Sequence, residues 1–264
     1  MSRISQQVQN QITASDKVAS SAETHAAKIG AALAERLPDP PAPAVRLSAE
    51  QWKTVVLQLG GHVRGQAGEL KAQELAYTAE QADDPPVREA RDAKVTEVVA
   101  LMTRLRSTVE DTLGRSALKA YGLTGETPRV PRKLLGHVEN VAQLLEKKPA
   151  TAATPFGASF DTAVAASSLR TQHAALTALL QAEDREAREL EDALTRRDRS
   201  AAAWTEGYQG VAGALEGLYR MAGWIELADR VRPTQRTLRG EDAGAEDDNG
   251  EEGSGDASGG EPPV

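Results

Sequence analysis

Four histidines are the residues best suited to metal or acid–base chemistry in this sequence. They stand at His25, His62, His137 and His173, in segments that we expect to form different helices. None has a glutamate three residues before it, as the dinuclear metal sites of helical bundles require, and the HExxH zinc motif is absent. The sequence therefore predicts no metal site. His173 is expected to be a hydrogen-bonded core residue.

The sequence also lacks the motifs that are typical of nucleophilic catalysis and of phosphate binding. No serine lies in a GxSxG turn, no glycine-rich turn precedes a GK[ST] motif, and the chain contains no cysteine. The acidic residues alternate with Arg and Lys at helical spacing, for example Asp184 with Arg188 and Asp192 with Arg196, which is typical of solvated helix faces. We therefore predict no catalytic residue, no cofactor and no small-molecule substrate, so the protein is not expected to be an enzyme.

Two basic clusters are the candidate charged sites. The first consists of Arg129, Arg132 and Lys133 around Pro131, and the second of Arg230, Arg232, Arg236 and Arg239 after the last expected helix. Because positive charge opposes the dipole at a helix start, the first cluster is a candidate contact for an anion, a phosphorylated partner or the chain's own acidic tail. The alternative is ordinary surface arginines at the ends of elements. Nucleic-acid binding is not expected, because the chain has no basic body with interleaved aromatics.

Glycines recur at helical spacing in the stretch YQGVAGALEGLYRMAG, where Gly210, Gly213 and Gly217 border an apolar face. A phosphate-binding loop would place them at a strand-to-helix turn, so that interpretation is rejected. Each glycine inside a helix costs about 1 kcal/mol relative to alanine. We therefore predict a smooth helix edge at which a neighbouring helix approaches closely.

A second glycine strip occurs in the first half of the chain. Gly61, Gly65 and Gly68 align on one side of a helix, opposite the stripe that contains Trp52, Leu59 and Val63. That helix is expected to contact partners on two faces, either as a middle helix within the fold or as an oligomer surface. Small-residue spacing of this kind also occurs in membrane helices, but the charged neighbours of this strip rule out a span.

The composition favours an all-α protein. Aromatic residues make up only 3% of the chain, so Ala, Leu and Val must fill the core, which suits closely packed helices better than sheets. Long apolar stripes with heptad-like spacing predict an elongated bundle or coiled-coil-like packing of long helices. No apolar stretch is long enough to span a bilayer or to form a signal peptide, and a cytoplasmic location is expected.

Prolines and glycines divide the chain into expected segments. We predict a weakly held or partner-dependent helix over 1–36, a proline-rich linker over 37–47, and a helical hairpin with a short third helix over 48–148. Ser48 and Gln51 form a capping-box pattern, and Pro85 and Pro86 mark the hairpin turn. Gly122 and Gly125 are expected to end the second helix of the hairpin. The short third helix is expected after Pro131, from about 132 to 147, with an apolar stripe of Leu134, Val138, Val141 and Leu145. A second linker over 149–160 precedes 161–239, which is either one long helix to about residue 228 or a hairpin.

The choice between helix and hairpin depends on the seam, meaning the positions spaced alternately by four and three residues from Leu169 to Ile225. His173, Glu183 and Arg197 are its only polar positions before Tyr208, which favours one helix. The hairpin alternative rests on Arg197, and also on a weak internal repeat that aligns Pro85 and Pro86 with 191–192.

The C-terminal segment 240–264 carries most of the charge imbalance. It contains nine of the 39 acidic residues and no Lys or Arg. The rest of the chain therefore has 30 acidic and 31 basic residues and is nearly neutral. Its low hydrophobicity predicts a disordered acidic tail.

These observations predict a structural or scaffolding protein. It is expected to act through helix–helix self-association or binding to another protein. The alternative is an adaptor or chaperone-like regulator whose acidic tail or basic clusters bind a charged partner.

Overall fold

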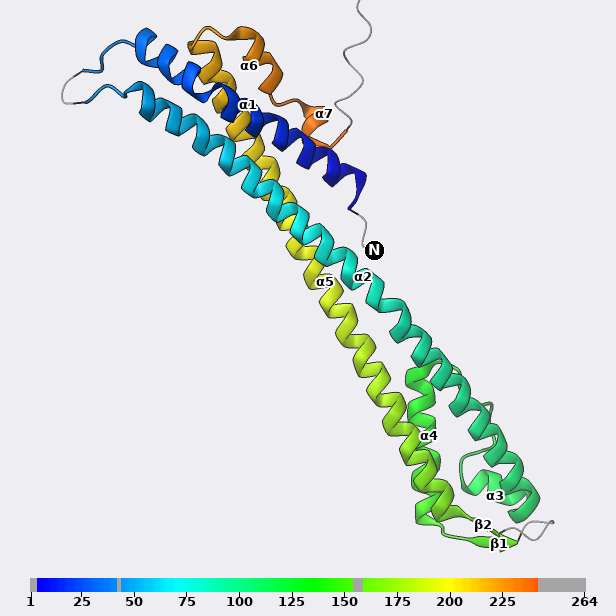
Figure 1. The fold of residues 1–264 in the computed structure, drawn as a ribbon. Coiled ribbons are helices and arrows are strands. Elements are labelled where there is room, and N and C mark those ends of the chain that lie inside the picture. Colours follow the sequence, from blue (N-terminus) through cyan, green and yellow to red (C-terminus); the bar gives the residue numbers. More distant parts are fainter. Residues whose placement is uncertain (1–3, 42–43, 154–158, 242–264) are drawn as a thin grey trace, which may run out of the picture. The chain divides into compact units, whose positions relative to one another are not determined.

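The structure of this chain is a computed structural model that describes residues 4–41, 44–153 and 159–241. The elements follow the order α1 (Gln6–Arg36), α2 (Ala49–Leu113), α3 (Arg115–Ala120), α4 (Pro131–Lys147), β1 (Thr151–Ala153), β2 (Ser159–Asp161), α5 (Thr162–Met221), α6 (Ile225–Val231) and α7 (Gln235–Leu238) (Figure 1). The expected all-α class, with long helices packed against one another, is confirmed. Of the predicted disordered tail, residues 242–264 lie outside the described residues.

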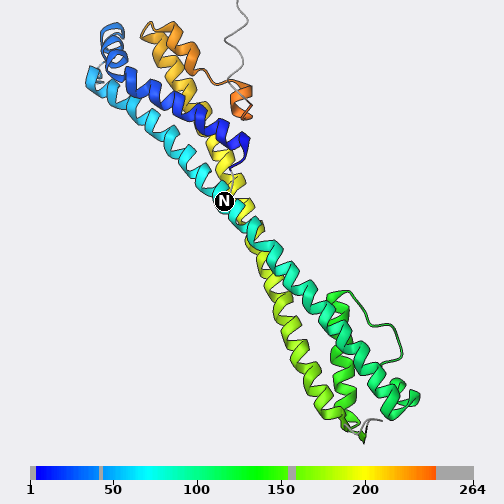
Figure 2. The same ribbon diagram turned by 45° about the vertical axis from the view of Figure 1, so that its right-hand side comes forward.

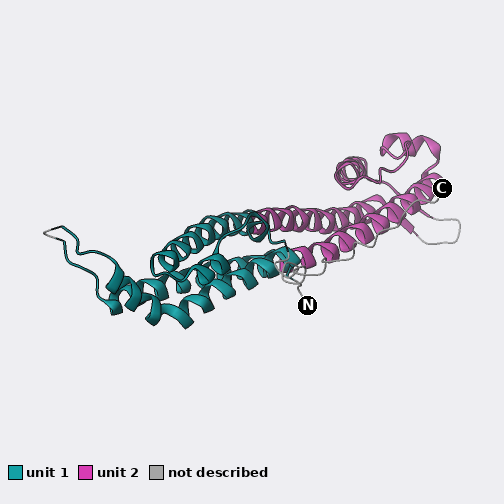
Figure 3. Ribbon diagram, turned by 90° about the horizontal axis from the view of Figure 1, so that it is seen from above, with its two compact units in different colours: residues 1–78, 195–264 teal, residues 79–194 magenta. Residues whose placement is uncertain are grey.

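The chain forms two compact units, shown in different colours in Figure 3. Unit 1 comprises residues 1–78 and 195–264, and therefore holds α1, α6 and α7 with the first part of α2 and the last part of α5. Unit 2 comprises residues 79–194 and holds the remainder of α2 and α5 with α3, α4 and the two short strands. The strands pair antiparallel, with Thr151 opposite Asp161.

The core of unit 1 forms where α1 packs beside α2 and α5 (Figures 1 and 2). Its fully buried side chains include Val18, Ile29 and Leu33 of α1, Val56, Val63 and Leu70 of α2, and Trp204, Leu215 and Tyr219 of α5. The Trp204 and Tyr208 rings stack with centroids 5.0 Å apart. The sequence predicts a weakly held or partner-dependent first helix, whereas the apolar stripe of α1 is covered within unit 1.

The core of unit 2 joins α2, α4 and α5. The predicted α4 stripe of Leu134, Val138, Val141 and Leu145 is fully buried, and it packs with Val98 and Met102 of α2 and Leu169 and Leu176 of α5. Pro131 stands at the start of α4, where its missing N–H would have no helical partner in any case. The helix predicted after residue 131 is thus confirmed.

The predicted turn at Pro85 and Pro86 is wrong, because α2 continues through both prolines. Proline adopts helical φ, although each one removes a backbone hydrogen bond at a cost of about 3 kcal/mol. The helix is held on both sides of the prolines by buried residues, Leu70 before and Val98 after, and Asp84 pairs with Arg88 at 2.6 Å. Tertiary packing therefore overrides the local preference for a turn.

The ends of α2 are set by local signals. At its start the predicted capping box is present, since the Ser48 N–H donates to Gln51 Oε1 at 2.8 Å and the Gln51 N–H donates to Ser48 Oγ at 3.3 Å. At its end, Gly114 has a φ of 81°, which L residues rarely adopt, and the helix stops there. The predicted end of this helix at Gly122 and Gly125 is wrong.

The seam from Leu169 to Leu218 lies in one unbroken helix, α5, so the hairpin alternative is excluded. All three polar seam positions meet a partner on another helix. His173 Nε2 lies 3.7 Å from Glu139 Oε2, Glu183 pairs with Arg91, and Arg197 Nε lies 3.0 Å from Glu74 Oε2. Arg197 thus occupies the seam as half of an ion pair, and the inferred turn at 191–192 is absent.

The C-terminal end of the seam departs from the prediction. We expected the helix to reach residue 228 with Ile225 in the core, but α5 ends at Met221 and the Ile225 side chain is 49% exposed. Gly223 has a φ of 85° and turns the chain into α6. Because that turn breaks the helical phase, residues after it no longer follow the seam.

Candidate interaction surfaces

Six glycines form two exposed faces on unit 1. The α2 glycine face consists of Gly61, Gly65 and Gly68, and the α5 glycine face consists of Gly210, Gly213 and Gly217. A Cβ built on any of the six would meet no other atom within 4 Å in the part of the chain that the structure describes. Both strips therefore face outward in the described part of the chain. For the α2 strip the middle-helix alternative is wrong, and close approach by a helix of a partner stays a prediction for both strips.

The close helix contacts of unit 1 occur at other glycines. A Cβ at Gly60 would lie 2.8 Å from Ala22 Cβ, and one at Gly30 would lie 2.8 Å from the Lys53 backbone nitrogen. These two glycines let α1 and α2 approach each other. Sequence reasoning passed over both, although the pairing of Gly60 with Ala19 and Ala22 is the kind of small-residue match that permits such an approach.

Gly207 has a different role within unit 1. The Gln66 side chain fills the space that a Cβ at Gly207 would occupy, and Gln66 Nε2 donates to the Ala203 carbonyl at 3.4 Å. Four glycines of unit 1 helices and turns, Gly30, Gly60, Gly207 and Gly223, are thus explained by contacts inside the unit. The six glycines of the two exposed faces are not.

The first basic cluster lies at the start of α4 and is partly neutralised. Arg132 donates to both carboxylate oxygens of Asp184 at 2.8 and 2.9 Å, so Asp184 pairs with this arginine across the unit and the expected pairing with Arg188 is wrong. Arg129 and Lys133 are exposed. Arg132, one of the three cations proposed to bind an anion, is therefore already paired with a carboxylate of the chain.

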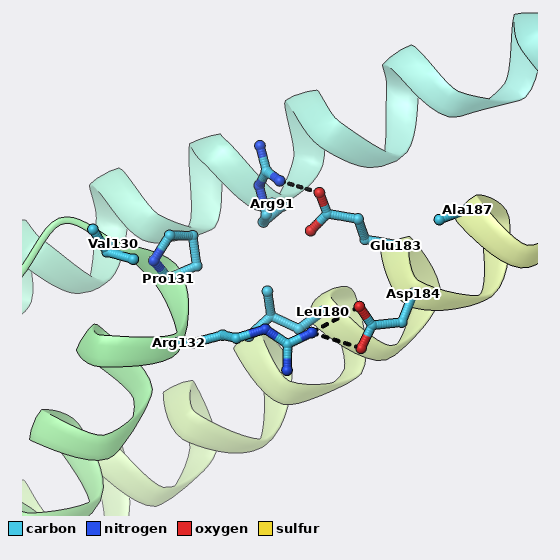
Figure 4. A pocket seen from close by; sticks show the side chains of 8 residues that line it. All are labelled: Arg91, Val130, Pro131, Arg132, Leu180, Glu183, Asp184 and Ala187. Carbon is cyan, nitrogen blue, oxygen red and sulfur yellow. Dashed lines mark hydrogen bonds and ion pairs between the residues drawn. The ribbon is translucent and has the colours of Figure 1, made fainter.

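A shallow open pocket of about 370 Å³ adjoins this cluster within unit 2 (Figure 4). Figure 4 shows its two ion pairs, Arg91 with Glu183 and Arg132 with Asp184, around a lining completed by Val130, Pro131, Leu180 and Ala187. Each arginine in the lining faces a carboxylate of the opposite sign. The pocket thus has no uncompensated charge that would select a charged ligand.

The second basic cluster lies on unit 1 around α6 and α7. Arg230, Arg232 and Arg236 are exposed, and Arg239 Nη1 lies 4.0 Å from Glu241 Oε1. Their side chains extend from short elements rather than from one continuous helix face. The cluster is therefore accessible, and its arginines are spread over α6, α7 and the residues that follow each helix.

Three carboxylates approach one another in unit 2. Ligand atoms of Glu80, Glu186 and Glu189 lie within 4.8 Å of one another. Arg185 lies 3.4 Å from Glu186 and 3.8 Å from Glu189, so a guanidinium already offsets part of their repulsion.

The four histidines lie on four separate helices. The pKa of His137 is lowered below its usual value, chiefly by burial and to a smaller extent by the nearby positive charge of Arg106.

Three polar contacts of unit 1 involve buried side chains. Glu74 is 4% exposed and accepts from the Ser5 backbone N–H at 3.1 Å and from Arg197 Nε at 3.0 Å. Burial acts to raise the pKa of Glu74, but the hydrogen bonds from Ser5 and Arg197 outweigh it and hold the pKa below its usual value. The Trp204 indole N–H donates to Ser15 Oγ at 2.8 Å. These contacts join α1, α2 and α5.

Comparisons with known proteins found no relative of this chain. No family model, curated protein or solved structure matches the chain. Among the helices of the described residues, none combines the length and the apolar character needed to cross a membrane.

Proposed function

We propose that this protein is a non-enzymatic helical scaffold that associates through helix–helix contacts, with copies of itself or with another helical protein. The observation that supports the proposal best is the pair of exposed glycine faces on α2 and α5. They leave helix backbone open to the outside on two elements of the same unit.

The cost of these glycines supports a partner. Each interior helical glycine costs about 1 kcal/mol relative to alanine, and open space around all six means that alanine would fit at each position. The fold itself therefore gains nothing from their lack of a side chain. A second helix that approaches the backbone closely would gain contact area at these positions, as small-residue helix interfaces do.

The position of the glycines is compatible with an intact core. On α2 they lie opposite the buried stripe of Val56, Val63 and Leu70, and on α5 they lie away from Val211 and Leu215. A partner could contact either face without displacing a core residue. We also propose a cytoplasmic setting, in which the lack of cysteine is compatible with a reducing environment.

The proposal is tested by the mass of the full-length chain as a function of concentration. Sedimentation equilibrium of the wild type is compared with a Gly213→Leu/Gly217→Leu variant and with Thr171→Leu, at an exposed position of α5 in unit 2. We expect a concentration-dependent oligomer that the glycine variant loses and the control retains. A wild type that stays monomeric at every concentration contradicts self-association.

A further inference from the structure

An exposed apolar corner lies where α5 turns into α6 in unit 1 (Figure 1). The side chains of Met221, Trp224 and Ile225 are 48%, 38% and 49% exposed, respectively. Aromatic residues are only 3% of this chain, and Trp204, Tyr208 and Tyr219 on the preceding helix are all buried. Among the aromatic residues that the structure describes, Trp224 is the one whose side chain is exposed. We call these three residues the Trp224 corner.

The backbone fixes the Trp224 corner. Gly223 has a φ of 85°, its N–H donates to the Arg220 carbonyl at 2.9 Å, and the Trp224 N–H donates to the Tyr219 carbonyl at 2.8 Å. This hydrogen-bond pair is a Schellman motif, which requires the left-handed glycine. A Cβ at Gly223 would also overlap the Arg36 guanidinium. The apolar side chains are thus presented by a defined turn.

Cations from α1 flank the Trp224 corner. Lys28 Nζ lies 6.0 Å from the centre of the Trp224 ring, the His25 ring lies 6.4 Å from it, and the Arg36 guanidinium lies against Gly223. Within the described ranges neither Lys28 nor Arg36 forms an ion pair with a carboxylate.

The carboxylates of α6 leave this positive rim in place. Asp229 is paired with Arg220 at 2.6 Å, and the first turn of α6 contributes a single acidic residue, Glu226. Arg220 also pairs with Glu216 at 3.1 Å, so two carboxylates share this one cation. The cations that lie beside the three exposed apolar side chains without a carboxylate partner in the described ranges are Lys28 and Arg36.

We propose that the Trp224 corner binds a segment of another protein in which acidic side chains flank an apolar one. Tryptophan in a rigid setting is a frequent energetic centre of protein interfaces, and complementary charge at the rim orients the partner. A two-fold contact centred on the Trp224 corner would bring the unpaired cations of two copies close together, and their repulsion disfavours a second copy as the occupant. An anionic bilayer is disfavoured by the nine acidic residues that begin at Glu241 in the same unit. The Trp224 corner begins one helical turn after Gly217 of the α5 glycine face, is separate from the α2 glycine face, and goes beyond the proposed function.

The proposal is tested with the full-length chain and a displayed library of helical peptides. The affinity of an enriched synthetic peptide is measured by fluorescence anisotropy for the wild type, Trp224→Ala, Lys28→Glu and Val164→Ser. Val164 is a matched control because it is an exposed apolar residue of unit 2, 68% exposed. Circular dichroism of each variant checks that the helices are retained.

We expect enriched peptides to carry Asp or Glu beside an apolar residue, and Trp224→Ala to weaken binding by at least about tenfold. Lys28→Glu should weaken binding similarly, and replacing the acidic peptide residue by lysine should restore part of the affinity. Val164→Ser should leave it unchanged. Gly61→Ala/Gly65→Ala/Gly68→Ala, which alters the α2 glycine face, should also bind the peptide normally, so failure of the scaffold proposal would not affect this result.

Three results would overturn the proposal. The first is a library that yields no peptide dependent on Trp224. The second is a set of Trp224-dependent peptides without acidic residues. The third is Trp224-dependent binding of the full-length chain to vesicles of equal parts phosphatidylcholine and phosphatidylserine, which would assign the corner to a membrane surface instead.

Discussion

Arg197 Nε donates to Glu74 Oε2 across 3.0 Å, and the pair joins α5 to α2 at a position where the apolar seam of α5 is interrupted. The Glu74 side chain is 6% exposed and that of Arg197 is 28% exposed, so the pair is largely shielded from water. The Arg197 guanidinium also lies 5.7 Å from the centre of the Tyr77 ring. The residue that suggested a turn therefore connects two long helices.

Replacing Arg197 by methionine should destabilise the protein by about 1 to 3 kcal/mol, because Glu74 would remain buried without its cation. The measurement is the free energy of unfolding from urea titration. Arg199→Met is the control, since Arg199 is exposed on the same helix and its loss should change stability by less than about 0.5 kcal/mol. Equal effects of the two substitutions would show that the pair contributes nothing specific.

Acid should weaken the wild type more than a Glu74→Gln variant. The pKa of Glu74 is lowered in the folded state, so the carboxylate contributes stability above its unfolded pKa of about 4.3. That contribution is lost as pH falls from this value through the lower folded pKa. Urea midpoints measured from neutral to acidic pH should therefore converge for the two proteins. Parallel curves would contradict this role of Glu74.

Removing the acceptor of the Trp204 indole should also destabilise unit 1. In Ser15→Ala the indole N–H would stay buried without a partner, at a cost of about 1 to 3 kcal/mol. Thermal unfolding followed by tryptophan fluorescence measures the effect. Ser20→Ala, at an exposed position of the same helix, should leave the transition near that of the wild type. An unchanged transition in Ser15→Ala would mean that water replaces the hydroxyl.

Tyr208 should ionise only in strongly alkaline solution. Burial raises its pKa to about 12 from a usual value of 10.0, so the folded state holds this proton more tightly than the unfolded chain does. Stability from this group is complete below about pH 10 and is lost as pH rises toward about 12. Tyrosine ionisation is followed by ultraviolet absorbance in the wild type and in Tyr208→Phe. The variant should lack one tyrosine among those that ionise at the high-pH end of the titration. A loss near pH 10 would place the phenol in water.

The sequence was sufficient for features that depend on spacing within one helix. The α4 stripe and the Ser48 capping box follow from local periodicity and side-chain chemistry, and both are confirmed. Features that depend on a distant partner were not accessible. Pro85 and Pro86 indicate a turn until the packing on either side is known, and Arg197 breaks the seam until Glu74 is found opposite it.

The glycines illustrate the same limit. Spacing alone identified two strips on helix faces, but it could not distinguish a face that a neighbouring helix covers from one that faces outward. Gly60 stands beside Gly61 in the sequence, and yet only Gly60 meets another helix, because Ala19 and Ala22 of α1 lie opposite it. Which neighbouring helix a given face of a helix meets depends on the tertiary fold, and the spacing of residues within one helix does not determine it.

The central claim is tested most directly by the self-association constant of a Gly61→Ala/Gly65→Ala/Gly68→Ala variant, measured by sedimentation equilibrium. Because a Cβ at each site meets open space, we expect the variant to be more stable than the wild type. Its free energy of unfolding, measured by urea titration, should rise by up to about 1 kcal/mol per site. Over the same concentrations we expect it to associate at least about tenfold more weakly than the wild type, since each methyl would hold a partner helix away. A variant that is more stable and associates as tightly as the wild type would contradict the proposed role of the α2 glycine face.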